Sequence, residues 1–536
     1  MNSVLKRRLI QLEDSGTHVH LKETLHGIEK EGLRVHSSGA LSLTPHPHQL
    51  GSSLTNGSVT TDFSESQLEL ITPVFPEPET AIDYLKTVHQ FTYSHLGDEL
   101  IWAGSMPCHI QDESSIPISD YGSSNMGKMK HIYRVGLQHR YGKMMQSIAG
   151  IHYNFSLSDK FWRAYQSQKK NKGSLNSFVS SSYFTLIRNF RRHSWLLLYL
   201  FGASPALSSS FMKGKDHNLQ RLHKKTLFLP YSTSLRMSDL GYATNAQSSL
   251  DICFNHLTTY LKSLTKAIHT SYPAYEKIGV KVEGSYRQLS TTILQIENEY
   301  YSDIRPKRIA RHEETPLQAL ENRGVEYVEV RNTDINPLLP LGMDIQQALF
   351  LDTFLISCLL MGDELLSPVE CRKLSDNLRL VTTRGREPGL NLYTLTGEID
   401  LKDAGVEIIR ELESTATLLD QLHNTDKYSL SVKAQFTKIQ DVALTPSAMV
   451  LTSLKESGLE YSEWILEKSK NHRNTLRNLN QNEATLSNLT QQAEESLIRQ
   501  KQLEDSDTLE FDEFLKIHRT GKKVNSVELL PNDKNR

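Results

Sequence analysis

Four short segments of the chain carry side chains whose types suit metal and phosphate chemistry. In chain order they contribute Glu29 and Glu31, Asp62 and Glu69, His152, and Glu329 and Arg331. Mg²⁺ prefers hard oxygen ligands and commonly takes carboxylates together with substrate phosphates. Many carboxylates with a single histidine suit Mg²⁺ or Mn²⁺ better than structural Zn²⁺, which uses more cysteine or histidine ligands. The set therefore points to divalent cations and, through them, to phosphate.

Positive groups must accompany these carboxylates, which would otherwise repel one another strongly. Arg331 could meet a transferring phosphoryl group as a planar donor fork. Ile304–Arg308 is a second cationic cluster that could hold phosphate. Any one such segment is more often a solvated sheet face than a site. Four such segments together leave open whether they form a solvated sheet face or a reaction site.

The same segments have the alternation of strands, in which residues two apart share a face. We expect strands over 27–35, 64–72, 149–157, 293–301 and 325–333. In 149–157, Ile151, Tyr153 and Phe155 form an apolar face and His152 points the other way. In each of the four acidic or histidine-bearing strands, the metal-ligand candidates lie on the polar face.

Asp62 and Glu69 are seven residues apart, so an unbroken strand would put them on opposite faces. If both serve one site, Asp62 must lie in the turn before the strand or at a bulge.

Composition is that of an ordinary globular protein. The chain has 536 residues with 38% hydrophobic and 23% charged residues, enough for two to four average domains or one large catalytic domain with appendages. A formal net charge of -2 gives no strong field toward nucleic acid or an anionic membrane, and we expect neither partner.

Four cysteines without a CxxC pair favour a reducing compartment, and we expect a cytoplasmic protein. The basic N-terminus lacks the apolar core of a signal peptide. The most apolar stretch, 348–361, contains Asp352 and is shorter than the ~20 residues of a spanning helix, so it is predicted to be a buried core helix.

Helical spacing is found at 77–99, 184–201 and 250–271, and again after Asp344. Strands are expected to return at 291–301. The order of elements favours the α+β class, with an antiparallel sheet covered by helices on one side. We expect a catalytic domain over 1–444, a helical C-terminal region over 445–518 and a disordered tail over 519–536.

Two other motifs carry no chemistry. Gly122–Lys128 has the GxxxxGK spacing, but Met129 replaces the Mg²⁺-binding hydroxyl and no apolar strand precedes it. Cys108 stands beside His109, yet adjacent residues in a strand point apart, so a buried thiol is the better interpretation.

Ordered blocks across the chain resemble the bacterial glutamate–cysteine ligase family. They are Gly27–Val35, Thr60–Phe63, Leu68–Pro73, Ser105–Cys108, Tyr199–Pro205, Leu229–Arg236, Leu294–Glu299, Ile304–Arg308, Glu329–Arg331 and Asp334–Pro337. The resemblance implies ATP-dependent amide formation, the first step of glutathione synthesis. ATP would phosphorylate the γ-carboxylate of L-glutamate, and the amine of L-cysteine would displace the phosphate.

The resemblance also implies roles for individual residues. The metal ligands would be Glu29, Glu31, Asp62, Glu69, His152 and Glu329. Arg331 would contact the transferring phosphoryl group or glutamate, with Glu329 as the second catalytic residue. The cysteine pocket would be formed by Phe63, Tyr133, Leu137 and Gln146, with Arg236, Tyr242 and Tyr301 near the cysteine carboxylate. Arg305, Lys307 and Arg331 would hold nucleotide phosphates.

The fold implied by the resemblance is shared with glutamine synthetase and guanidino kinases: a curved antiparallel sheet forming a funnel, with helices on its outer face. A monomer, inhibited by glutathione at the cysteine pocket, is implied too. Two alternatives stay open. One is a carboxylate–amine ligase with another acceptor, and the other is a non-catalytic binding protein that kept the scaffold.

Overall fold

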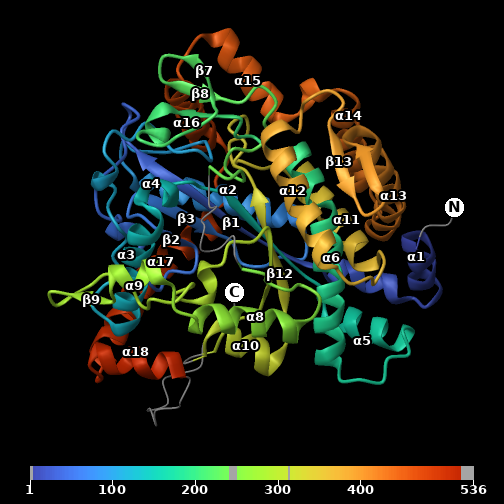
Figure 1. The fold of residues 1–536 in the computed structure, drawn as a ribbon, viewed down its shortest axis with the longest axis horizontal. Coiled ribbons are helices and arrows are strands. Elements are labelled where there is room, and N and C mark those ends of the chain that lie inside the picture. Colours follow the sequence, from blue (N-terminus) through green and yellow to red (C-terminus); the bar gives the residue numbers. More distant parts are fainter. Residues whose placement is uncertain (1–3, 241–249, 312–313, 521–536) are drawn as a thin grey trace.

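The computed structural model describes residues 4–240, 250–311 and 314–520. Its main sheet contains seven strands: β1 (Leu25–Val35), β2 (Val59–Thr61), β3 (Gln67–Ile71), β4 (Leu100–Ile101), β5 (Ile151–Ser156), β11 (Ile304–Lys307) and β12 (Tyr327–Thr333). The order is β11-β12-β5-β1-β3-β2, with β4 against the end of β1, and every pairing is antiparallel. This sheet crosses the centre of the molecule (Figure 1).

Helices make up most of the remaining described chain. They are α1 (Val4–Asp14), α2 (Pro78–His95), α3 (Asn125–Tyr141), α4 (Lys143–Gln146), α5 (Asp159–Gln168), α6 (Leu175–Phe201), α8 (Leu257–His269), α9 (Pro273–Ile278), α10 (Pro316–Arg323), α11 (Ile345–Leu360), α12 (Pro368–Arg384), α13 (Leu401–His423), α14 (Lys427–Gln440), α15 (Pro446–Ser457), α16 (Tyr461–Asn478), α17 (Glu483–Ser506) and α18 (Phe511–Thr520). The predicted α+β class is confirmed.

Three smaller sheets lie outside the main one. Their strands are β6 (Ala206–Ser208), β7 (Gln220–His223) and β8 (Thr226–Phe228), the pair β9 (Lys281–Val282) and β10 (Ser285–Tyr286), and the pair β13 (Asn391–Thr394) and β14 (Gly397–Asp400).

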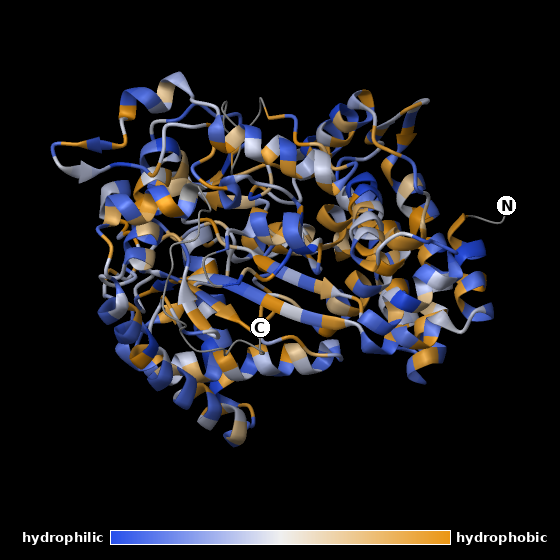
Figure 2. Ribbon diagram, turned by 90° about the horizontal axis from the view of Figure 1, so that it is seen from below, coloured by the Kyte–Doolittle hydropathy of each residue, from blue (hydrophilic) through white to orange (hydrophobic). Residues whose placement is uncertain are grey.

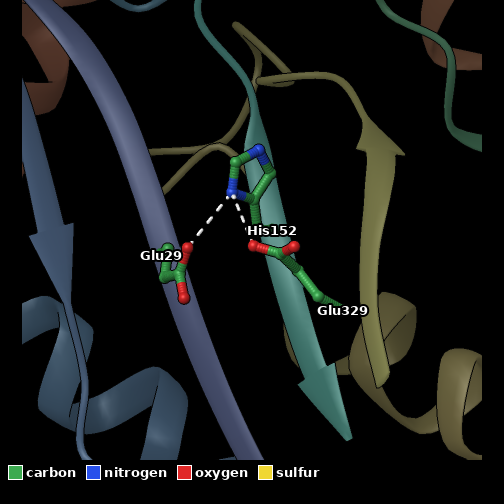
Figure 3. A group of neighbouring side chains, drawn as sticks. All are labelled: Glu29, His152 and Glu329. Atoms are coloured by element: carbon green, nitrogen blue, oxygen red, sulfur yellow. Dashed lines mark hydrogen bonds and ion pairs between the residues drawn. The ribbon is translucent and has the colours of Figure 1, made fainter. Parts of the chain in front are cut away.

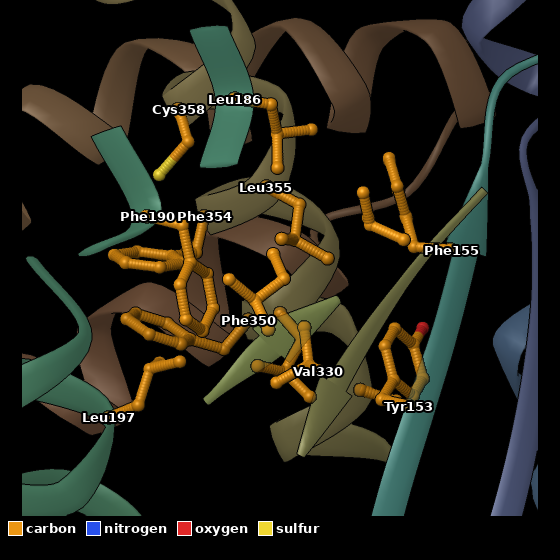
Figure 4. Close-up of a cluster of buried hydrophobic side chains, with 14 of the residues drawn as sticks. Tyr153, Phe155, Leu186, Phe190, Leu197, Val330, Phe350, Phe354, Leu355 and Cys358 are labelled. Carbon is orange, nitrogen blue, oxygen red and sulfur yellow. The ribbon is translucent and has the colours of Figure 1, made fainter. Parts of the chain in front are cut away.

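The largest hydrophobic core lies between the main sheet and the helices α6 and α11. Phe190 of α6 and Phe354 of α11 meet edge to face, with ring centroids 5.8 Å apart, and Tyr153 and Val330 pack from the sheet (Figure 4). All of these side chains are fully buried. Each buried aromatic or aliphatic side chain contributes about 1.5–3 kcal/mol through burial. The apolar face predicted for 149–157 is thus the face that holds the helices.

Helix α11 is the predicted buried core helix. Its single charged residue, Asp352, accepts a hydrogen bond from the Tyr153 hydroxyl (2.8 Å) and lies 3.0 Å from His26 Nε2. Because the buried carboxylate has these partners, the helix can be apolar all round and still contain an aspartate.

Helix α6 begins nine residues before the predicted start at Phe184. The Ser174 hydroxyl accepts the N–H of Ser177 and caps the first turn, a local signal that favours a start there. The helix ends before Gly202, as predicted. Hydrophobic residues gather where the helices meet one another and the sheet, while hydrophilic residues cover the outer turns (Figure 2).

The strand predicted over 291–301 is wrong. Within the described chain the segment makes an isolated antiparallel bridge between Thr292 and Ser271 but joins no sheet, and it contains a 3₁₀ turn at Glu297–Glu299. Its side chains bond within the segment: Thr292 Oγ1 donates to the Leu294 carbonyl, and Glu299 Oε2 accepts the N–H of Gln295 (2.6 Å). Such local bonds compete with a strand ladder.

Two other predicted elements are shorter than expected. The helix over 250–271 begins only at Leu257, where His256 and Thr259 form a capping box. The strand over 64–72 begins at Gln67, because Ser64 accepts the N–H of Gln67 in a turn.

The described part of the chain holds no helix that is both long and apolar enough to span a membrane. Helices α16 and α17 pack against α2, which itself covers β1 and β3. The division into a catalytic domain over 1–444 and a helical region over 445–518 stays a prediction, and residues 521–536 of the predicted tail lie outside the described residues.

Candidate active site

Strand register brings the predicted chemistry to one face of the main sheet. Glu29 lies opposite His152, and Glu31 lies opposite Glu69. Glu329 lies opposite Arg305 on the next pair of strands. Residues directly opposite in an antiparallel pair share a face. Segments up to 300 residues apart therefore project onto a single surface.

Glu29, His152 and Glu329 form the tightest group, and one ligand atom from each lies within 4.8 Å of the others. His152 Nδ1 is 3.1 Å from Glu29 Oε2 and 3.7 Å from Glu329 Oε1 (Figure 3). Asn154 holds the second oxygen of Glu29 with a 2.8 Å hydrogen bond. The three residues come from neighbouring strands, which fix their positions.

Two cations flank Glu329. Arg331 donates to its Oε1 (3.0 Å), and Lys307 Nζ lies 3.4 Å from its Oε2. Burial works to raise the pKa of Glu329, yet Lys307 and Arg331 hold that pKa well below its usual range. The same carboxylate raises the pKa of Arg331 despite burial. Both groups are therefore charged at neutral pH.

The pKa values of Glu31 and Glu69 are shifted upward, in contrast to that of Glu329. Burial and the charge of Asp62 raise the pKa of Glu31 to about 8. Burial and the charges of Glu29, Asp62 and Glu31 raise the pKa of Glu69 well above its usual value. The nearby arginines offset this only in part: Arg134 lies 3.9 Å from Asp62, and Arg236 and Arg331 lower the pKa of Glu31. A bound cation would relieve the remaining repulsion between the carboxylates.

Asp62 lies in the turn between β2 and β3, which is one of the two placements, turn or bulge, that the seven-residue spacing allowed for a site shared with Glu69. Its N–H donates to the Gln67 carbonyl (3.0 Å). Two residues that the sequence analysis missed fix this turn. Tyr121 donates to the carbonyls of Thr61 and Asp62, and Arg134 donates to the Asp62 carbonyl.

A cavity of about 620 Å³ opens over this face. Its walls contain every predicted metal ligand and, from the predicted substrate and nucleotide residues, Phe63, Tyr133, Leu137, Gln146, Tyr301, Arg305, Lys307 and Arg331. Arg305 also donates to the carbonyls of Asn298 and Tyr300, so it fixes the neighbouring loop.

One predicted substrate residue is placed differently. Arg236 is buried and does not line this cavity. It donates to the Arg331 carbonyl (3.0 Å) and lies 3.7 Å from Asp334 Oδ1. Tyr242 lies outside the described residues.

The cavity walls also contain residues that sequence reasoning did not identify, among them Lys130, Arg134, Arg140, Tyr141 and Glu299. The first four share helix α3 with Tyr133 and Leu137 at helical spacing. Once Tyr133 and Leu137 were placed on a helix, residues three or four positions away on the same face could have been identified from the sequence.

The donor set fits a divalent cation that prefers oxygen. Oε2 of Glu329, although buried, accepts no hydrogen bond from any described residue. Burial and Arg331 lower the pKa of His152, which keeps its imidazole neutral as a metal ligand must be. Opposite ligands of one Mg²⁺ lie about 4.2 Å apart, so the 4.8 Å cluster needs only a small side-chain adjustment.

Known proteins resemble this chain over almost its whole length. A family model described as glutamate-cysteine ligase matches residues 9–381. A glutamate–cysteine ligase of Pseudomonas putida is 49% identical over 521 residues, which cover 96% of this chain and 98% of the relative. One of Pseudomonas aeruginosa is 47% identical over 515 residues, with coverages of 96% and 98%.

Solved structures agree with this result. Glutamate–cysteine ligase of Francisella tularensis, in complex with AMP, superposes with a TM-score of 0.87 at 38% identity and covers 93% of this chain and 98% of its own. A bifunctional glutathione synthetase of Pasteurella multocida gives a TM-score of 0.68 at 25% identity, with coverages of 87% and 54%. The predicted resemblance is confirmed: the chain belongs to the glutamate–cysteine ligase family.

Proposed function

We propose that this protein joins the γ-carboxylate of L-glutamate to the amine of L-cysteine at the expense of ATP, the first step of glutathione synthesis. Its membership of the glutamate–cysteine ligase family supports this reaction. The observation that carries the proposal is the cluster of Glu29, His152 and Glu329 beside Arg331 and Lys307 in one cavity. The AMP complex of the Francisella relative supports binding of an adenine nucleotide there.

The chemical problem is that a carboxylate is a poor electrophile. Transfer of the terminal phosphoryl group of ATP to the γ-carboxylate of glutamate gives an acyl phosphate, in which phosphate is a good leaving group. Attack by the cysteine amine then forms the amide and releases phosphate. The cavity must hold the reactants close together and limit water, because water would otherwise compete with the amine.

Glu29, His152 and Glu329 would hold one Mg²⁺, with Glu31, Asp62 and Glu69 available for further ions, and Mn²⁺ could substitute. When bound, Mg²⁺ would neutralise negative charge on the phosphate oxygens. Since both Glu31 and Glu69 have raised pKa values, cation binding there would displace protons.

Arg331 is the residue we assign to the transferring phosphoryl group. Its guanidinium is oriented by Glu329, and it approaches His152 Nδ1 to 3.3 Å, so it lies beside the candidate metal ligands. Phosphoryl transfer depends mainly on positioning and charge neutralisation, which a fixed planar cation supplies. Lys307 and Arg305 would hold the nucleotide phosphates.

The acceptor end of the cavity would be formed by Phe63, Tyr133, Leu137, Gln146 and Tyr301. Two phenolic hydroxyls and two apolar side chains suit a small, partly apolar amino acid. For Arg236, a role at the cysteine carboxylate would require its side chain to leave the Arg331 carbonyl, and Tyr242 would join it.

We also propose that the main sheet curves into a funnel like that of glutamine synthetase and guanidino kinases. Support comes from the division of its two faces, one charged and lining the cavity, the other covered by α6 and α11. The same proposal includes that the protein is a monomer and that glutathione inhibits it by binding at the acceptor pocket. The four free cysteines support a reducing compartment such as the cytoplasm.

The test is ADP release by the purified protein with Mg²⁺ and ATP, measured with glutamate, with cysteine and with both. The proposal predicts sustained release only with both amino acids, and γ-glutamylcysteine as the product. Release that is independent of cysteine, or faster with another amino acid in competition, would assign a different acceptor.

A further inference from the structure

A buried ion pair joins the two walls of the acceptor end of the cavity. Arg140 stands at the end of α3, and Glu299 lies in the loop 288–301. Arg140 donates to Glu299 Oε1 across 2.9 Å, and the two side chains are 0% and 1% exposed. The proposed reaction does not use either residue, so their burial beside the cavity needs another explanation.

The Arg140 guanidinium holds the loop by several bonds at once. It donates to Gln288 Oε1 (3.0 Å) and to the carbonyls of Ser290 (2.6 Å) and Ile293 (3.3 Å). Its central carbon also lies 4.1 Å from the centroid of the Tyr275 ring. The rigid fork of an arginine is suited to this, because a lysine ammonium cannot reach several fixed acceptors in one plane.

Glu299 is held equally firmly from the loop side. Its Oε1 also accepts the Tyr141 hydroxyl (2.5 Å), and its Oε2 accepts the N–H of Gln295 (2.6 Å). These bonds turn Glu299 into the wall rather than toward solvent. They also fix the backbone two residues before Tyr301.

Gln295 completes the connection to helix α3. Its amide donates to the Tyr133 carbonyl (3.2 Å), and it accepts the N–H of Leu289 (2.9 Å). A Cβ at Gly136 would lie 2.1 Å from Gln295 Oε1, so only glycine allows this approach. The loop and helix α3 are thus joined at two places, by the Arg140–Glu299 pair and by the bond from Gln295 to Tyr133.

We propose that the Arg140–Glu299 pair is a positioning element that sets the width of the acceptor end of the cavity and thereby selects for a cysteine-sized amino acid. Leu137 and Tyr133 are three and seven residues before Arg140 on the same face of α3, and Tyr301 is on the loop that Glu299 fixes. The pair therefore controls the separation of side chains that we assign to the acceptor. This inference rests on the proposed function.

The experiment compares the full-length wild type with Arg140→Lys and Tyr141→Phe in the ADP-release assay. Arg140→Lys keeps the charge but loses the fork. Tyr141→Phe removes only one hydroxyl from Glu299 and is the milder change. Arg287→Lys is the matched control, because Arg287 is an exposed arginine in the same region. Thermal unfolding of each variant verifies that it is folded.

Three acceptors are compared: L-cysteine, L-2-aminobutyrate with a methyl in place of the thiol, and L-norvaline with one methylene more. A methylene in a fitted pocket is worth roughly 10–200-fold in kcat/KM. For Arg140→Lys we expect the KM for cysteine to rise roughly tenfold and the discrimination against norvaline to fall by a similar factor. The KM for ATP should stay within about twofold, and Tyr141→Phe should show a smaller change in the same direction.

Wild-type acceptor KM and selectivity in both folded variants would overturn the proposal. So would equal rises in the KM for ATP and cysteine, or a fall in kcat alone, because these are the effects of a general structural role. If Arg140→Lys does not fold, Tyr141→Phe decides by the same criteria. Failure of the proposed function can be told apart from failure of this positioning role, because in the first case the wild type would show no cysteine-dependent ADP release.

Discussion

Replacing Glu329 by glutamine tests the electrostatic design of the site. The carboxylate is 2% exposed and lies 3.0 Å from Arg331 and 3.4 Å from Lys307. At an effective dielectric constant of about 20, Coulomb's law gives roughly 5 kcal/mol for each pair. The desolvation cost of the buried ions offsets much of this gain. The amide would leave two cations without their counter-charge.

For Glu329→Gln we expect the free energy of unfolding to fall by about 3–5 kcal/mol, the usual cost of breaking a buried pair on one side. Turnover should fall by at least about 100-fold, because the variant loses a proposed metal ligand and the group that orients Arg331. The assay is ADP release as a function of Mg²⁺ concentration, with thermal unfolding measured in parallel.

Glu326→Gln is the matched control, since Glu326 is exposed and only three residues away. It should retain wild-type turnover. A Glu329→Gln protein with wild-type turnover and an unchanged Mg²⁺ response would refute the assignment of this carboxylate to the metal and to Arg331.

Three further predictions follow from the same structure. Arg331→Ala should lower kcat by roughly two or more orders of magnitude in the ADP assay, and an effect on KM alone would limit Arg331 to binding. Because the folded pKa of Glu31 is raised to about 8, the metal-free folded state binds more protons than the unfolded state between about pH 4.5 and 8. Its thermal stability should therefore fall as pH rises through that window, and Mg²⁺ should stabilise the protein more at pH 8 than at pH 6. A Mg²⁺-induced shift in melting temperature that is the same at both pH values would contradict this linkage. Phe354→Ala should reduce the free energy of unfolding by about 3–5 kcal/mol in denaturant titrations, and a loss below about 1 kcal/mol would mean that the core collapses around the gap.

The acidic face of the main sheet could be predicted because strand alternation is a local property. Glu29 and Glu31 lie on β1 with their apolar neighbour Ile28 turned to the core, as period-two spacing requires. The same counting required Asp62 to lie in a turn or at a bulge if it shares a site with Glu69, and it lies in a turn. Spacing alone identified the faces, although it did not indicate which strands would be neighbours.

The segment 291–301 could not be predicted because, besides its local hydrogen bonds, its structure depends on a distant partner. Gln295 and Glu297 alternate with the apolar Leu294 and Ile296, so the segment resembles a solvated strand. Glu299 is instead fixed by Arg140, which is 159 residues earlier in the chain. The buried arginine makes an inward carboxylate favourable, and this pairing leaves no local pattern in the sequence.

Diffraction from crystals grown with Mn²⁺ and ATP is the decisive test of the proposed metal site, because manganese can be located by its anomalous signal. We expect an anomalous peak bounded by Glu29, His152 and Glu329, which disappears or weakens strongly in Glu329→Gln. Manganese bound only elsewhere, in crystals of a protein that releases ADP in a cysteine-dependent reaction, would contradict it.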